Sequence, residues 1–146
     1  MKRLSAVLVL FATFMFFSAG TALAESSILD LTGKWTTKSY GHHHEKRGFF
    51  SNSEADGKWV IKEQQGRFFY GERSYTRKQI DSSKVTTEGF SGVISRDGKR
   101  LYIVDHDEDI LIGDVLSDGS VELIMMNDGD KNHHSKIGLI EIERAK

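Results

Sequence analysis

Hydrophobic and polar residues alternate in short runs along most of this chain, and glycine-containing turns separate the runs. Runs rich in Val, Ile, Tyr, Phe and Thr predict β-strands, because successive side chains of a strand point to opposite faces. No segment after Leu31 has the apolar spacing of an amphipathic helix. Eight strands are expected, at 31–40, 57–64, 67–75, 84–94, 100–105, 110–117, 120–126 and 136–143.

Three of the connections have the composition of tight hairpin turns. Gln65-Gly66, Asp97-Gly98 and Asp118-Gly119 each place a glycine where a hairpin needs a positive φ. Short strands joined in sequence by hairpins favour an all-β fold, an eight-stranded antiparallel up-and-down β-barrel, because closure leaves no open edge. A β-sandwich is the alternative architecture for the same strands.

The first 24 residues differ from the rest of the chain. Lys2 and Arg3 precede an apolar run, Leu4 to Phe17, and Ala22-Leu23-Ala24 offers the small residues of a cleavage site. This is the pattern of a secretory signal peptide, and the run is shorter than the about 20 residues that cross a bilayer. We expect a signal peptide at 1–24, a single β-barrel domain at 25–146, and a periplasmic or extracellular protein after cleavage near Ala24.

Composition narrows the class of partner. The chain has no cysteine, so its packed core must stabilise it without disulfides. The formal net charge is −1, and two of the basic residues belong to the expected signal peptide, so the remaining domain is acidic. No basic stripe is left, which argues against nucleic acid as a partner.

The segment SYGHHHEKRGFF, residues 39–50, contains three consecutive histidines. In an up-and-down meander the connections alternate between two ends, so the three tight turns share one end and the loops 41–56, 76–83, 106–109 and 127–135 share the other. Carboxylates in DHDED, residues 105–109, and in NDGDKNHH accompany the histidines. Loops on a rigid scaffold often carry binding residues, so we expect a barrel mouth at this end. The six histidines that fall in these loops are His42, His43, His44, His106, His133 and His134.

Three interpretations of the histidines stay open. In the first they bind a transition metal, since imidazole and carboxylate ligands suit Zn, Cu(II) or Ni, and no thiolate is available. In the second they sense pH, because imidazoles become charged together near pH 6. In the third they are hydrophilic loop residues. Calcium in DHDEDILIGD has less support, because the glycine and glutamate positions of an EF-hand loop are not matched. The candidate metal ligands are His42, His44, His106, His133 and His134.

Two segments resemble a known group of barrels. LTGKW, residues 31–35, resembles the opening of the calycins (the lipocalins and avidins), where a Gly-x-Trp on the first strand seats the tryptophan across one barrel end. FFYGERSY, residues 68–75, resembles the Gly-x-x-x-Tyr rhythm of a later avidin strand. The resemblance implies a calycin-like barrel with a ligand cavity. It does not extend to biotin, because the only tryptophans are Trp35 and Trp59 and the second half has no counterpart of avidin's biotin-contacting tryptophans.

Aromatic side chains on the expected strands are the candidate ligand contacts, although they would also serve as barrel core. Glycines at 71, 89, 92 and 113 remove side-chain volume and could leave space for a ligand, although strand glycines also mark bulges. The leading expectation is therefore a non-catalytic, calycin-like binding protein for a small hydrophobic or mixed ligand. The candidate ligand-binding residues are Trp35, Trp59, Phe68, Tyr70, Phe90 and Tyr102.

The last four strands are apolar on both faces, which predicts a homo-oligomer interface on their outer face. The chain has no Cys nucleophile, Gly-x-Ser-x-Gly or His-Glu-x-x-His motif, so an enzyme stays uncertain. A metal at the mouth could still activate water. Two further hypotheses are a transition-metal-binding protein that uses the mouth histidines, and a protein-interaction or inhibitor module that uses the same loops.

Overall fold

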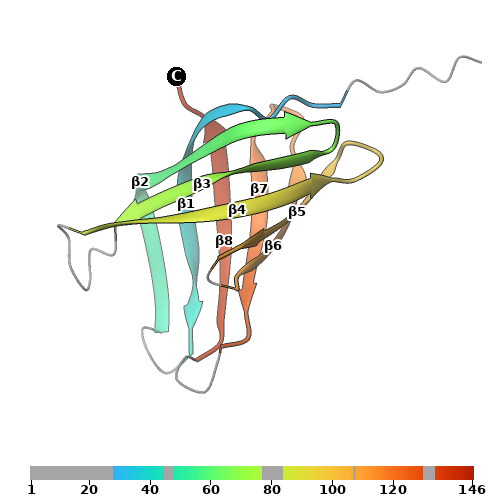
Figure 1. Ribbon diagram of the computed structural model, residues 1–146. Helices are drawn as coiled ribbons and strands as arrows, with labels where there is room; N and C mark the ends of the chain where they lie inside the picture. The colour runs from blue at the N-terminus through green and yellow to red at the C-terminus, as the bar shows by residue number, and fades with distance from the viewer. Residues whose placement is uncertain (1–27, 45–47, 77–83, 107, 130–133) are drawn as a thin grey trace, which may run out of the picture.

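The computed structural model describes residues 28–44, 48–76, 84–106, 108–129 and 134–146, and of residues 52–56 it describes only the backbone. The strands pair in sequence order and β1 also pairs with β8, which gives a closed antiparallel barrel and confirms the expected fold (Figure 1). The expected signal peptide lies outside the described residues. The strands are β1 (Gly33–His43), β2 (Gly48–Gln65), β3 (Phe68–Thr76), β4 (Val85–Ile94), β5 (Arg100–Asp105), β6 (Ile110–Val115), β7 (Val121–Asn127) and β8 (Lys136–Arg144).

The three predicted glycine turns close one end of the barrel. Gly66, Gly98 and Gly119 have φ angles of 57°, 74° and 83°, in the left-handed region that favours glycine. These turns join β2 to β3, β4 to β5 and β6 to β7. The opposite end, termed the loop end here, carries the connections that follow β1, β3, β5 and β7. In the part of the chain that the structure describes, no helix is long and apolar enough to cross a membrane.

The first hairpin is longer than the sequence predicted. The expected loop 41–56 is wrong, because β1 continues to His43 and β2 begins at Gly48. The physical reason is pairing on both edges of β1: His42 lies opposite Phe49 of β2 and opposite Ile137 of β8. Two ladders therefore hold this polar segment extended, although its composition resembles that of a loop.

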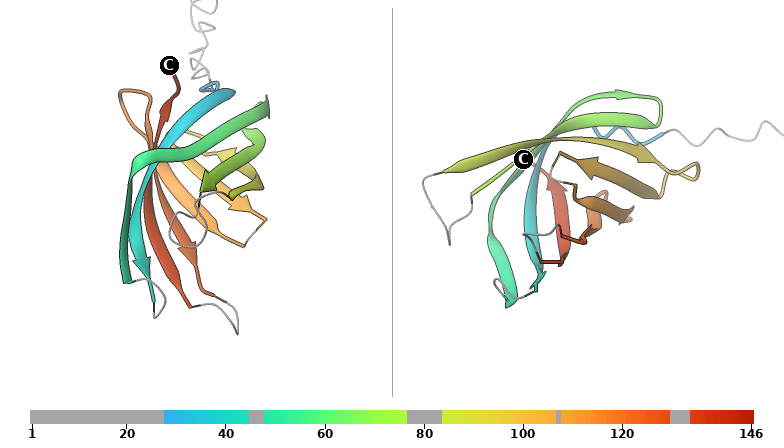
Figure 2. Two further views of the ribbon diagram at one scale, coloured as in Figure 1. Left: turned by 90° about the vertical axis from the view of Figure 1, so that its left-hand side faces the viewer. Right: turned by 60° about the horizontal axis from the view of Figure 1, so that its bottom comes forward.

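The strands diverge at the loop end. Among the described residues, β2 pairs with β3 only from Lys58 to Gln65, whereas its first part, from Gly48 to Asn52, pairs with β1. The register between β1 and β2 shifts between Thr37 and Ser39. As a result, the tips of β1 and β2 point away from the tips of β3 and β4, as Figure 2 shows from two further sides.

A tryptophan closes the opposite, short-turn end. Trp35 is 1% exposed, and its indole Nε1 donates to the Leu31 carbonyl oxygen at 2.9 Å. The Arg144 guanidinium from β8 lies over the indole, 4.6 Å from the ring centroid, and also donates to the Thr32 carbonyl oxygen at 2.9 Å. These contacts tie the segment before β1 to the last strand, so this end is sealed by side chains.

Candidate functional site

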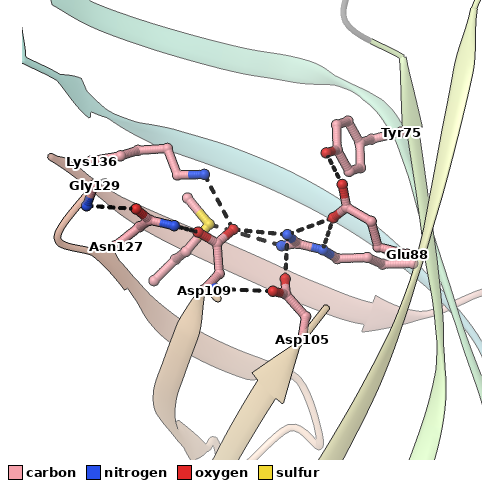
Figure 3. Close-up of polar contacts among 9 residues, drawn as sticks. Tyr75, Glu88, Asp105, Asp109, Asn127, Gly129 and Lys136 are labelled. Atoms are coloured by element: carbon pink, nitrogen blue, oxygen red, sulfur yellow. Dashed lines mark hydrogen bonds and ion pairs between the residues drawn. The ribbon is translucent and has the colours of Figure 1, made fainter. Parts of the chain in front are cut away.

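The barrel interior has two halves of different chemistry. The half near the short turns is filled by buried apolar side chains, among them Trp59, Phe69, Phe90, Leu101 and Leu123. The half near the loops contains the buried charged residues Arg73, Glu88 and Asp109 and the buried carboxylate of Asp105. The charges therefore lie between the apolar half and the loop end, and they are termed the Arg73 cluster (Figure 3).

Arg73 of β3 is the centre of this cluster, because its guanidinium contacts three carboxylates from different parts of the barrel. Nε donates to Oε2 of Glu88 at 3.0 Å, and Nη2 donates to Oδ2 of Asp109 at 2.8 Å. Nη2 also forms an ion pair with Asp105, at the end of β5. Burial alone would lower the pKa of Arg73, but the three carboxylates outweigh it and raise that pKa, so the guanidinium stays charged.

Asp109 joins Arg73 to the opposite wall of the barrel. Its Oδ1 accepts from Asn127 Nδ2 at 2.8 Å, and its Oδ2 accepts from Lys136 Nζ at 3.1 Å. Its backbone N–H donates to Oδ1 of Asp105 at 3.0 Å. Burial would raise the pKa of Asp109, but Arg73, Lys136 and Asn127 favour the ionised form and bring the pKa below its ordinary value. The cluster thus links β3, β4, β5, β7 and β8 across the interior.

Tyr75 extends the cluster toward the loops. Its hydroxyl donates to Oε1 of Glu88, and the Arg73 guanidinium lies 5.6 Å from the centroid of its ring. Tyr75, Asn127 and Lys136 are only half-buried, unlike the charges beneath them. The half-buried positions Ser39 and Thr86 belong to the same inward series on β1 and β4. The arrangement therefore places hydroxyl, amide and ammonium groups between the buried charges and the loop end.

The six candidate ligand-binding residues divide into two groups. Trp35, Trp59 and Phe90 lie in the interior, where Trp59 packs on Phe90 with ring centroids 4.7 Å apart. Phe68, Tyr70 and Tyr102 instead lie on the outer surface and are 66%, 47% and 43% exposed. These three rings therefore do not line the interior, where a ligand inside the barrel would contact them. The reason is strand alternation: Phe69 of β3 faces inward, and so do Leu101 and Ile103 of β5.

The strand glycines make room for neighbouring rings of the protein itself. A Cβ at Gly71 would lie 2.7 Å from Cζ of Phe90, and one at Gly92 would lie 2.4 Å from Cζ of Phe69. At Gly89 a Cβ would lie 2.8 Å from Cε1 of His106. Gly71 and Gly113 also lie close to the backbone of a neighbouring strand, where a Cβ would meet the carbonyl oxygens of Val60 and Glu122 respectively. The space at the inward-facing Gly71, Gly92 and Gly113 is therefore occupied by this chain's own atoms, so the apolar half of the barrel is packed there. Gly89 lies between the inward-facing Glu88 and Phe90, so the space that it leaves for His106 is on the outer face.

The described histidines all lie at the loop end, as predicted, but the structure separates them. His42 lies on β1 beside Phe49, with ring centroids 4.8 Å apart, and His106 lies against Gly89 of β4. His44 and His134 come together where β1 meets β8, with ring centroids 6.2 Å apart. These two segments are neighbours because the closed barrel pairs β1 with β8.

The predicted metal site is not assembled by the residues that the structure describes. Among them, no group of three or more His, Cys, Asp or Glu side chains is arranged to hold a metal ion. His133, one of the five candidate ligands, lies outside the described residues. His106 follows β5, so β6, β7 and β8 separate it from the His44–His134 pair.

The sequence indicated only part of the Arg73 cluster. Asp105 and Asp109 stood out in DHDED, but as rim residues beside histidines. Arg73 and Glu88 were missed, although a signal was present: each lies on the inward face of its strand, in step with Phe69 and Phe90. An arginine and a glutamate at inward positions of adjacent strands predict a buried ion pair, and their opposite charges are the feature to search for.

The comparisons with known proteins bear on the fold of this chain and on no other property. No family model matches the chain, and no curated protein matches it. Among solved structures, the chain is similar to a redesigned β-barrel, with a TM-score of 0.51 and 10% sequence identity over 80% of this chain and 92% of that one. At this identity the likeness supports the β-barrel fold and says nothing of a ligand.

Proposed function

We propose that this protein is a non-catalytic, calycin-like binding protein that admits a small mixed ligand, part apolar and part polar, at the loop end of its barrel. The observation that carries the proposal is that one half of the interior is apolar and packed, whereas the half near the loops is polar. The Arg73 cluster is buried beneath half-buried polar groups, and the strands diverge above it. The packed state of the apolar half favours a ligand that lies above the cluster.

The Arg73 cluster suits the floor of such a site. Its ionised groups already have partners, so a ligand would meet a preorganised polar surface rather than unpaired charges. Tyr75, Asn127 and Lys136 are half-buried, unlike the charges beneath them, and each can exchange a hydrogen bond with a ligand. Trp35 seals the opposite end, as the calycin resemblance implies, which leaves the loop end as the entrance.

The test fills the proposed entrance with a side chain. Ser39 lies on the inward face of β1 and Lys38 on the outward face, where it pairs with Glu143. The probe is the fluorescent anion 1-anilinonaphthalene-8-sulfonate, which has an apolar ring system and a sulfonate. The expected result is that the wild type enhances its fluorescence, that Ser39→Trp abolishes the enhancement and that the matched control Lys38→Trp retains it. Equal binding by Ser39→Trp and the wild type would contradict the proposal.

Native mass spectrometry of the protein purified without a tag or chelator tests the same proposal without a probe. An organic molecule bound in the wild type and absent from Ser39→Trp supports it. The full-length gene should be expressed with its own leader, since the measured mass then also shows whether residues 1–24 have been removed. An unliganded mass together with no response of the fluorescent probe would argue against a ligand site.

A transition-metal site at His44 and His134 is the second candidate function. The observation in its favour is that these rings lie 6.2 Å apart, which brings two imidazoles to one place. Zinc, copper and nickel bind imidazole nitrogen. Protein zinc sites usually have three or four protein ligands, so tight binding here would need at least one more ligand beside the two imidazoles. Titration with Zn²⁺ in a calorimeter, with His44→Ala and His106→Ala side by side, tests this. Loss of zinc binding in His44→Ala alone is the expected result.

A further inference from the structure

The outer surface of β5 to β8 carries a continuous apolar patch. Two residues from each of these strands form it: Tyr102 and Val104, Ile110 and Ile112, Ile124 and Met126, and Ile137 and Leu139. Six of the eight side chains are 37% to 56% exposed, and Ile112 and Leu139 are half-buried between them. This set is termed the outer patch. It lies on the side of the sheet opposite to the Arg73 cluster.

The strand register shows that the outer patch is a regular grid. Tyr102, Ile112, Ile124 and Leu139 lie opposite one another on successive strands and make one row. Val104, Ile110, Met126 and Ile137 make a second row, nearer to the loop end. Neighbours within a row are about 5 Å apart and the rows are about 7 Å apart, so the side chains form one unbroken surface.

The outer patch contains no charged side chain, but charges border it. The next outward row toward the short turns consists of Arg100, Asp114, Glu122 and Glu141. Arg100 Nε and Asp114 Oδ1 are 2.8 Å apart, so this border is partly neutralised within the chain itself. An apolar centre with a polar rim is the usual anatomy of a protein interface. The partner must therefore present a broad, uncharged and apolar surface.

We infer that the outer patch is a dimer interface and that its partner is a second copy of this chain. The six exposed side chains offer on the order of 500 Å² of apolar surface. The largest apolar patch on a typical monomeric protein measures about 300–600 Å², so the outer patch lies in the upper part of that range. With its border the patch approaches the about 800 Å² that each partner buries in a specific interface. A two-fold axis brings the same surface of both copies together, and an uncharged patch meets itself without repulsion.

The dimer leaves the loop end of each barrel uncovered. The outer patch faces away from the barrel interior, so ligand entry and self-association use different surfaces. The inference therefore does not depend on the proposed binding function. Ser39→Trp, which blocks the entrance, is expected to dimerise like the wild type, so the failure of one proposal can be told from the failure of the other.

The experiment is sedimentation velocity on the full-length gene product over the micromolar range, with its mass recorded beforehand. The decisive variant is Ile124→Lys, at the centre of the grid, and the matched control is Val85→Lys on β4, outside it and 62% exposed. The wild type and Val85→Lys are expected to be dimers. Ile124→Lys is expected to be a monomer, with a dissociation constant raised by about a hundredfold or more, because two lysines would face one buried interface.

Methyl NMR of the wild type gives a second measurement that does not depend on the folding of a variant. Dilution is expected to shift the Ile110, Ile112, Ile124 and Ile137 signals while the interior Ile103 and Ile140 signals stay in place. A wild type that remains monomeric at the highest concentration would overturn the inference. So would a dimer that Ile124→Lys leaves intact, or a monomer whose outer patch carries a co-purified lipid.

Discussion

The two halves of the barrel interior are stabilised in opposite ways. Near the short turns, apolar side chains such as Leu111, Val121 and Leu123 have no exposed surface, and burial of apolar area provides the stabilisation. Near the loops, Arg73 and its three carboxylates are nearly as buried, but their charges must be satisfied by one another. A buried charge cluster adds little net stability when it is complete and costs much when it is broken.

Removing the centre of the Arg73 cluster is expected to have the largest effect. Arg73→Met keeps much of the side-chain volume but leaves Glu88, Asp105 and Asp109 without the guanidinium. Breaking a buried pair in this way typically costs about 3–5 kcal/mol, because the remaining charges are uncompensated. The measurement is urea unfolding at neutral pH, followed by tryptophan fluorescence. The matched variant Arg73→Met with Glu88→Gln and Asp109→Asn should recover part of the loss, and no recovery would show that Arg73 stabilises mainly through packing.

A cavity in the apolar half is expected to cause the next largest loss in the free energy of unfolding. Leu123→Ala removes a fully buried side chain, and such changes cost about 3 kcal/mol through lost burial and the cavity that remains. The loss should be the same at pH 5 and pH 7, because Leu123 belongs to the apolar core cluster. Urea unfolding at both pH values measures it. A loss that changed with pH would show that the two halves are coupled more closely than their chemistry suggests.

Acid is expected to destabilise the loop-end half of the wild-type interior before the apolar half. The pKa of Asp109 is lower in the folded protein than in the unfolded chain, so its stabilisation is complete above the unfolded value of about 3.9. That stabilisation is lost as the pH falls through the lower, folded pKa. We therefore expect amide exchange in acid to rise first around Asn127 and Lys136, before it rises around Leu123. Asp109→Asn should lessen this difference, and uniform exchange across both halves would contradict it.

The apolar half is the part that the sequence predicted best. Alternation around Trp35, Trp59 and Phe90 reflects burial on one face of each strand, and the glycine turns fix where strands end, so local rules suffice. The Arg73–Glu88 pair has a local signal, because the two residues lie opposite each other on adjacent strands. The contacts of Arg73 with Asp105 and Asp109 depend on which segments face each other across the barrel, and no local pattern contains that information. Phe68 and Tyr70 illustrate a second limit: a shift of one position exchanges the faces of a strand, and the structure places Phe69 inward, against Gly92.

The smallest effect is expected at an ion pair that lacks burial. Arg100 and Asp114 form a close pair on the outer surface, with side chains 50% and 53% exposed, so water screens both charges. Arg100→Gln should leave the melting temperature within experimental error of the wild type at moderate salt, because exposed pairs contribute little. Scanning calorimetry measures this, with Arg73→Met as the contrasting variant. Arg100 pairs with one exposed carboxylate, and Arg73 with three buried ones. A large loss in Arg100→Gln would mean that burial is not what makes an arginine–carboxylate pair of this protein costly to break.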